Sequence, residues 1–132
     1  KFTMAYPRIG TSADCSTSWG LVRMLGQRKA MEIALLSEPF DAAEALRLGL
    51  VNRVVPAEAL IEEAGKMAQR LAEGAPIALG NLKRLVREAA DNDLHTHLAL
   101  EATLFQQCAE SADFAEGMAA FLGKREAKFQ GR

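Results

Sequence analysis

Apolar side chains recur every three or four residues through the second half of the chain, which is the spacing of an amphipathic α-helix. Four such stripes follow one another: Leu60, Ile61, Ala64, Met67, Ala68 and Leu71; Leu79, Leu82, Val86 and Ala89; Leu94, Leu98, Ala102, Phe105 and Cys108; and Met118, Phe121 and Leu122. Each helix must bury its apolar face against another surface. The pattern therefore predicts a mainly helical assembly over residues 56–132.

Proline and capping residues predict where several helices begin. Pro56 and Pro76 suit the first turn of a helix, where no backbone N–H is needed. Residues 41–44 and 113–116 each place an Asp three positions before a Glu. This is the form of a capping box, in which the two side chains satisfy N–H groups at the start of a helix. We expect a short helix after the first box and the last helix after the second.

The first half of the chain mixes strand and helix signals. Residues 2–6 are mostly apolar, which favours a strand ended by Pro7, and residues 50–55 favour another strand. Between them, a helical pattern over residues 16–25 stops at Gly26, and a further helix follows. The chain begins without a methionine, and a strand at its start needs sheet partners that the chain does not supply. We therefore expect a preceding part of the protein to supply them.

Composition argues against several classes of function. The 132 residues carry a formal net charge of −1, so we expect no basic surface for nucleic acid or an anionic membrane. No window approaches the roughly 18 apolar residues of a membrane span, and no signal peptide is visible. Cys15 and Cys108 lie far apart, which favours reduced thiols in a cytoplasmic protein. His95 and His97 are two apart on a predicted helix and point in different directions, so no metal site is expected.

The stretch YPRIGTSADCSTSW, residues 6–19, holds a single acid, Asp14, between a predicted strand and a predicted helix. Asp and Ser are preferred N-caps, so Asp14 or Ser16 could simply cap the helix that follows. A carboxylate at a strand-to-helix turn, surrounded by Tyr6 and Trp19, could equally move a proton or act as a nucleophile. The residue pattern leaves both interpretations open.

Two ordered motifs cover much of the chain. The first has the form L-x-R-x-x-G-x-x-x-A-x-x-x-x-L, continued by A-x-E-A-x-x-x-G-L-V-x-x-V. The matching residues are Leu21, Arg23, Gly26, Ala30, Leu35, Ala42, Glu44, Ala45, Gly49, Leu50, Val51 and Val54. The second is the ending EGMAAFLGKREAKFQGR, which is similar to E-G-x-x-A-F-x-x-K-R-x-x-x-F. Together they resemble the second half of the crotonase, or enoyl-CoA hydratase/isomerase, family, and the resemblance extends over the whole chain.

This resemblance implies an α/β fold of crotonase type, a spiral of strands and helices. Residues 1–55 would be the end of the spiral core with the Asp14 turn, and residues 56–132 a helical trimerisation region. Self-association as a trimer or hexamer is implied. The implied substrate is an acyl-CoA thioester, so coenzyme A is part of the substrate and no separate cofactor is expected. The two N–H groups that stabilise an enolate in the family would lie in the half that precedes this chain.

The resemblance also implies roles for individual residues. The second glutamate of hydratases falls at Tyr6, and a phenol is a poor substitute for a carboxylate base, so hydration by two glutamates is disfavoured. Asp14 falls where dienoyl-CoA isomerases and the ring-opening isomerases of phenylacetate breakdown carry a proton-moving aspartate. This match favours a catalytic Asp14, with Tyr6 and Trp19 lining the substrate pocket. Phe121 and Lys124 match positions that contact the adenine and phosphates of coenzyme A.

Three functions are compatible with these residues. The preferred one is double-bond isomerisation, or hydration, of an enoyl-CoA through an enolate. The second is a hydrolytic enzyme similar to 4-chlorobenzoyl-CoA dehalogenase, in which the aspartate that matches Asp14 is a nucleophile. The run from Asp14 to Trp19 is closer to that type. A non-catalytic relative whose helices only assemble subunits is the third, because Tyr6 replaces a catalytic glutamate.

Overall fold

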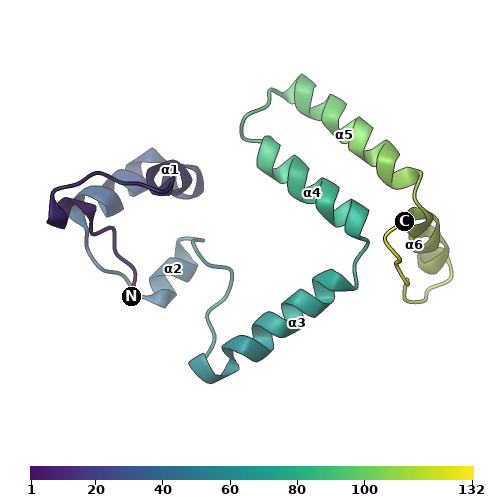
Figure 1. Cartoon of the computed structure of the whole chain (residues 1–132), viewed down its shortest axis with the longest axis horizontal. Coiled ribbons are helices and arrows are strands. Elements are labelled where there is room, and N and C mark those ends of the chain that lie inside the picture. The colour runs from purple at the N-terminus through teal and green to yellow at the C-terminus, as the bar shows by residue number, and fades with distance from the viewer. The chain divides into compact units, whose positions relative to one another are not determined.

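The computed structural model describes residues 1–132 and divides into two compact units, Lys1–Glu58 and Ala59–Arg132. Figure 1 shows the helices of each unit along the chain. The elements in chain order are the 3₁₀ helix η1 (Tyr6–Ile9), α1 (Thr17–Leu36), α2 (Ala42–Arg47), the 3₁₀ helix η2 (Ala57–Ala59), α3 (Leu60–Ala72), α4 (Pro76–Glu88), α5 (Leu94–Ala109) and α6 (Ala112–Leu122).

The first unit contains α1, whose course is interrupted at Gly26. This residue has φ 75° and ψ 159°, far from helical values, so α1 consists of two helical segments joined at a glycine. A positive φ of this kind is inexpensive only for glycine. The predicted break at Gly26, with a second helix after it, is confirmed.

The strand predicted over residues 2–6 is reduced to a single bridge. Phe2 and Phe40 exchange two backbone hydrogen bonds of 2.8 and 3.0 Å, and their rings stack with centroids 5.6 Å apart. Tyr6 already begins the 3₁₀ helix η1. A strand needs a partner along its length, and within this chain only Phe40 pairs with the segment.

The strand predicted over residues 50–55 is wrong. The chain there forms turns and irregular structure. Gly49, with φ 73°, reverses the backbone after α2, and the N–H of Leu50 returns to the carbonyl of Ala45 at 2.9 Å. The first residue of the predicted strand is therefore used to end a helix.

Side chains anchor the start of the chain to the end of α1. The hydroxyl of Thr3 and the guanidinium of Arg8 both donate to the carbonyl of Ser37, at 3.1 and 2.6 Å. Ser37 is buried, and so are Met4 and Ile33 beside this anchor in the core of the first unit. The segment that carries Tyr6 is therefore fixed on a rigid element before the chain enters the Asp14 turn.

The second unit contains α3 to α6, of which α4, α5 and α6 pack against one another in sequence. Figure 1 shows α4 and α5 as neighbouring helices that run in opposite directions. Leu104 of α5 is almost completely buried, and the amide of Asn81 on α4 donates to its carbonyl at 3.2 Å. The helices predicted after Pro76 and from Leu94 are confirmed.

Three helices begin with a side-chain cap. Asp41 accepts from the N–H of Glu44, and Asp93 accepts from the N–H of Thr96, both at 2.9 Å. The first residue of the predicted pair at 41–44 therefore caps α2 as expected. The capping box predicted over residues 113–116 is wrong, because the cap of α6 is Ser111, which precedes it.

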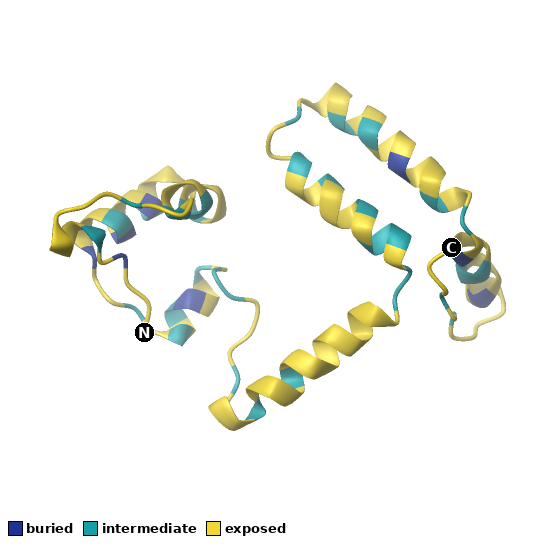
Figure 2. Ribbon diagram, in the orientation of Figure 1, coloured by how far each residue is buried: buried dark blue, intermediate teal, exposed yellow.

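Many apolar side chains remain exposed within each unit. Figure 2 shows α3 in the exposed colour over most of its surface, and none of its residues is buried. Ile61 is 82% exposed and Leu71 is 56% exposed. The helical stripe is as predicted, but the surface that would cover it is not in the second unit. No helix has the length and apolar character that crossing a membrane would require.

Candidate active site

Asp14 and Tyr6 meet at the turn that precedes α1. The Tyr6 hydroxyl donates to Oδ1 of Asp14 at 2.7 Å, and the same phenol oxygen lies 3.3 Å from Oγ1 of Thr17. Thr17 in turn donates its hydroxyl to the backbone carbonyl of Asp14 at 2.8 Å. The carboxylate lies at the surface, whereas Tyr6 is half-buried. The site is thus an accessible carboxylate held from one side by a phenol.

The carboxylate of Asp14 does not cap the helix. The N-cap residue of α1 is Ser16, and no side chain forms a capping hydrogen bond there. Instead, the carbonyl of Asp14 accepts the N–H of Thr17 at 2.9 Å. The carboxylate is therefore available for a role other than helix initiation.

The turn after Asp14 is strained. Cys15 and Ser16 have φ values of 49° and 62°, in the left-handed region. Each such residue costs on the order of 1–2 kcal/mol when it is not glycine. A conformation of this kind persists where its surroundings hold it, and it is most frequent at functional sites.

Trp19 lies on the first turn of α1 and is 58% exposed. The guanidinium of Arg23 stacks on its indole ring at 3.7 Å from the centroid. This contact fixes the ring near the start of the helix that Asp14 precedes. Trp19 and Tyr6 both lie close in sequence to Asp14, but no hydrogen bond or ring contact joins Trp19 to the Tyr6–Asp14 pair.

A second group of predicted site residues lies at the end of α6. Phe121 is 79% exposed, and Lys124 is an exposed residue of the turn after the helix. The N–H groups of Lys124 and Arg125 return to the carbonyls of Phe121 and Ala120, at 3.2 and 3.0 Å. This pair of bonds is a Schellman motif, with Lys124 at its left-handed position, φ 49°.

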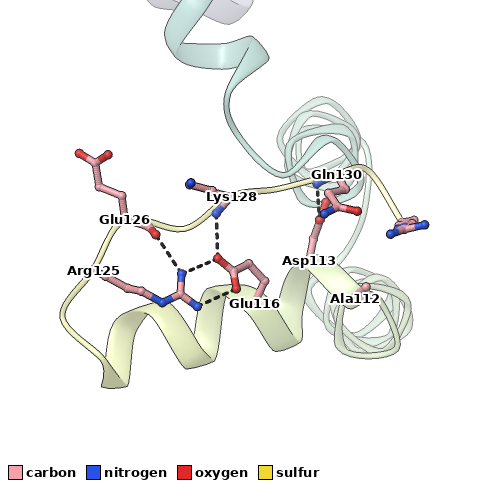
Figure 3. Close-up of a pocket in the computed structure, with 8 residues that line it drawn as sticks. Ala112, Asp113, Glu116, Arg125, Glu126, Lys128 and Gln130 are labelled. Carbon is pink, nitrogen blue, oxygen red and sulfur yellow. Dashed lines mark hydrogen bonds and ion pairs between the residues drawn. The ribbon is translucent and has the colours of Figure 1, made fainter.

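The residues after this turn, 125–131, form a segment that we call the C-terminal strap. Glu116 of α6 holds its beginning: its two carboxylate oxygens accept from Nη1 and Nη2 of Arg125 at 2.6 and 2.8 Å, and one also accepts the N–H of Lys128 at 2.9 Å (Figure 3). The hydrogen bonds from the Arg125 guanidinium are the largest cause, and the bond from the Lys128 N–H the next, of a pKa of Glu116 that is lowered to about 2. The pair therefore stays ionised throughout the physiological range.

Asp113 holds the end of the strap. Its carboxylate accepts the N–H group of Gln130 at 2.6 Å (Figure 3). It also accepts the N–H group of Gly131 at 2.8 Å, and the N–H of Asp113 itself donates to the carbonyl of Arg132 at 3.0 Å. Asp113 is only 3% exposed. A buried carboxylate is stable only when hydrogen bonds of this kind compensate its lost hydration.

The sequence did not predict the contacts of three residues: Thr17, Asp113 and Glu116. Thr17 was predicted only as a residue of the first helical turn, and Asp113 and Glu116 were predicted to form a capping box. The spacing from Glu116 to Arg125 crosses a turn, so no helical or strand period relates the two residues. Ser111 could have indicated this, because serine is an equally good N-cap. With Ser111 as the cap of α6, Asp113 and Glu116 are not needed to cap the helix.

Solved structures share this arrangement of helices. An enoyl-CoA hydratase structure from Geobacillus kaustophilus HTA426 is 38% identical and has a TM-score of 0.93, over 97% of this chain and 50% of that one. An enoyl-CoA hydratase structure from Polaromonas sp. JS666 is 39% identical with a TM-score of 0.91, over 98% and 50%. The units therefore have the crotonase fold, as the sequence predicted.

The profile of the enoyl-CoA hydratase/isomerase family matches residues 1–132, and the chain belongs to this family. A protein of Escherichia coli K12 named 1,2-epoxyphenylacetyl-CoA isomerase is 37% identical over 132 residues, which is 100% of this chain and 50% of that protein. The chain spans about half the length of the relatives it matches, and it corresponds to their C-terminal half.

Proposed function

We propose that the protein carrying this chain is an acyl-CoA isomerase that shifts a double bond, with Asp14 as the group that moves the proton. The observation that carries this proposal is the 2.7 Å hydrogen bond from Tyr6 to an exposed Asp14 carboxylate that caps no helix. A helix-capping aspartate would direct its oxygens at backbone N–H groups, as Asp41 does in the same unit.

The chemistry asked of Asp14 is a proton transfer between two carbons of one substrate. The carboxylate takes a proton from the carbon next to the thioester, and the electron pair of that C–H bond moves to the thioester oxygen as an enolate. The enolate then reforms the carbonyl while the double bond shifts, and the Asp14 carboxylic acid returns the proton at the γ carbon. The hydroxyl of Tyr6, by donating to Oδ1, orients the carboxylate throughout.

One feature of the chain favours isomerisation over hydration. Addition of water by a pair of glutamates needs a carboxylate at position 6, and this chain has Tyr6. The names of the relatives favour neither reaction, because the Escherichia coli protein is named as an isomerase and the two solved structures as enoyl-CoA hydratases. Replacement of the glutamate by Tyr6 does not require a nucleophilic role for Asp14.

Coenzyme A would be bound as part of the substrate, without a separate cofactor. The exposed ring of Phe121 offers a stacking face for adenine, and the ammonium of Lys124 offers a point charge for phosphate. Trp19 and Tyr6 would line the acyl side of the site. We place the protein in the cytoplasm, in keeping with its two free thiols, Cys15 and Cys108.

An isotope experiment with the full-length protein tests this function. A 3-enoyl-CoA labelled with deuterium at the α carbon should give a 2-enoyl-CoA that retains part of the label at the γ carbon, because one carboxylate removes and returns the same proton. Water carrying heavy oxygen should leave no label in the product. Incorporation of heavy oxygen as a hydroxyl would indicate hydration instead.

The same reaction mixture separates the covalent alternative. If Asp14 attacked carbon, a peptide containing residues 6–19 would gain the mass of an acyl or aryl group during turnover. The proposal predicts that this peptide keeps its unmodified mass. A protein that turned over no acyl-CoA at all would support the non-catalytic interpretation.

A further inference from the structure

Lys124 occupies a backbone position that glycine fills elsewhere in this chain. After α2, the N–H groups of Gly49 and Leu50 return to the carbonyls of Leu46 and Ala45 at 3.0 and 2.9 Å, and Gly49 has φ 73°. The turn after α6 has the same hydrogen bonds, but its left-handed residue is Lys124. A lysine therefore occupies a left-handed position at which the backbone favours glycine.

The C-terminal strap fixes the backbone on the far side of Lys124. Arg125 is held at both of its terminal nitrogens by Glu116, and the end of the strap is held by the buried Asp113. The ring of Phe129, near the end of the strap, lies against α6, where a Cβ added to Gly117 would be 3.5 Å from the ring. Lys124 is therefore bracketed by the end of α6 on one side and by an ion pair on the other.

The ion pair also separates the roles of two adjacent cations. The guanidinium of Arg125 is neutralised by Glu116, so it contributes little charge to a ligand. The ammonium of Lys124 extends from the preceding residue at the surface. The turn therefore has one neutralised cation, Arg125, next to one exposed cation, Lys124, on a backbone that the ion pair holds.

We propose that Glu116 is a positioning residue: through its ion pair with Arg125 it holds the turn that presents Lys124 to the phosphates of coenzyme A. This inference rests on the proposed function, because it takes acyl-CoA as the ligand. Glu116 does not touch the ligand itself, and its effect on binding passes through Lys124.

The experiment measures the dissociation constant of coenzyme A and the kinetics of the full-length protein for four variants: E116Q, K124G, the double variant and E88Q. Glu88 forms an ion pair of 2.8 Å with Arg84 on α4, outside the strap, and serves as the matched control. Each protein is also assayed with the same acyl group on N-acetylcysteamine, which lacks the nucleotide.

E116Q and K124G should each raise the dissociation constant of coenzyme A and the KM for acyl-CoA by roughly threefold to tenfold, the size expected for a partly solvated charged contact. Their kcat should be nearly unchanged, because the lost contact stabilises the bound substrate and the transition state equally. With the N-acetylcysteamine thioester, both should behave as the wild type. The double variant should be no weaker than K124G, because the two residues act through one contact. E88Q should match the wild type throughout.

K124G keeps the comparison informative if E116Q loosens the fold. Glycine is the better residue at φ 49°, so K124G should unfold at a higher temperature than the wild type while binding coenzyme A more weakly.

The inference would be overturned by any of three results: unchanged coenzyme A binding by E116Q, additive losses in the double variant, or equal losses with the truncated thioester. Absence of coenzyme A binding by the wild type would also overturn it. A protein that binds coenzyme A and catalyses no reaction would contradict the proposed function alone.

Discussion

Asp14 illustrates what residue type can and cannot establish. Aspartate is both a preferred N-cap and a common proton carrier, so the sequence of the turn favoured neither role. The structure adds the direction of the carboxylate, toward Tyr6 and away from the backbone N–H groups of α1. The turn that follows Asp14 has left-handed conformations at Cys15 and Ser16, which no pattern of polar and apolar residues predicts.

Replacing Tyr6 by Phe tests the hydrogen bond while keeping the ring. The change removes the only donor from Tyr6 to Asp14, worth about 1 kcal/mol for an accessible charge-assisted bond, so kcat should fall about fivefold. Stopped-flow or steady-state turnover of the full-length protein measures it. Thr17→Val serves as a comparison, because Thr17 contacts the phenol oxygen and the backbone carbonyl of Asp14 but not its carboxylate. An equal kcat for wild type and Tyr6→Phe would show that the bond has no catalytic role.

The pH response of Glu116 follows from its ion pair. Its pKa is lowered from 4.5 to about 2, so the strap is stabilised fully above about pH 4.5 and loses this contribution as the pH falls toward 2. In a carboxyl carbon NMR titration, Glu116 should therefore titrate near pH 2 in the wild type. In R125Q the midpoint should move up toward 4.5. A midpoint near 4.5 in the wild type would contradict the ion pair.

Helices were predicted well because their signals are local. The break at Gly26 and the starts of α4 and α5 follow from neighbouring residues, and the structure confirms them. The strand over residues 2–6 could not be settled in this way, because a strand is completed by partners distant in sequence. The strand over residues 50–55 failed because Gly49 ends α2 with a motif that uses Leu50.

The cap of α2 gives a prediction for a single helix. Asp41→Ala removes the oxygen that accepts the Glu44 N–H, and it should lower the free energy of unfolding by about 1 kcal/mol. Thermal or urea unfolding of the full-length protein measures the change. Asp41→Asn should be nearly neutral, because Asn caps almost as well. A loss from Asn as large as that from Ala would assign the effect to charge instead of capping.

The exposed apolar surface is a property of the whole molecule. Leu60, Ile61 and Leu71 of α3 are more than half exposed, and so is Phe105 of α5. An exposed surface of this extent marks an interaction site. The chain spans about half the length of its relatives, so the preceding part of the protein that we expect, and neighbouring copies, are the candidate partners.

Self-association of the full-length protein is therefore expected, as a trimer or hexamer assembled through its C-terminal helices. Light scattering at micromolar concentration should give a mass three or six times that of one chain. Ile61→Glu, which places a charge on an 82% exposed position of α3, should lower that mass if α3 lies in an interface. A stable monomer of the wild type would contradict the prediction.

Turnover by Asp14→Asn in the full-length protein tests the proposed proton transfer itself. Asparagine keeps the size of the side chain and an oxygen for the Tyr6 hydroxyl, so the unfolding temperature should hardly change. It cannot accept and return a proton, so kcat should fall by roughly 10²–10⁴-fold. If Asp14→Asn retained the turnover of the wild type on the substrate that the wild type converts, Asp14 would not be the proton-moving group.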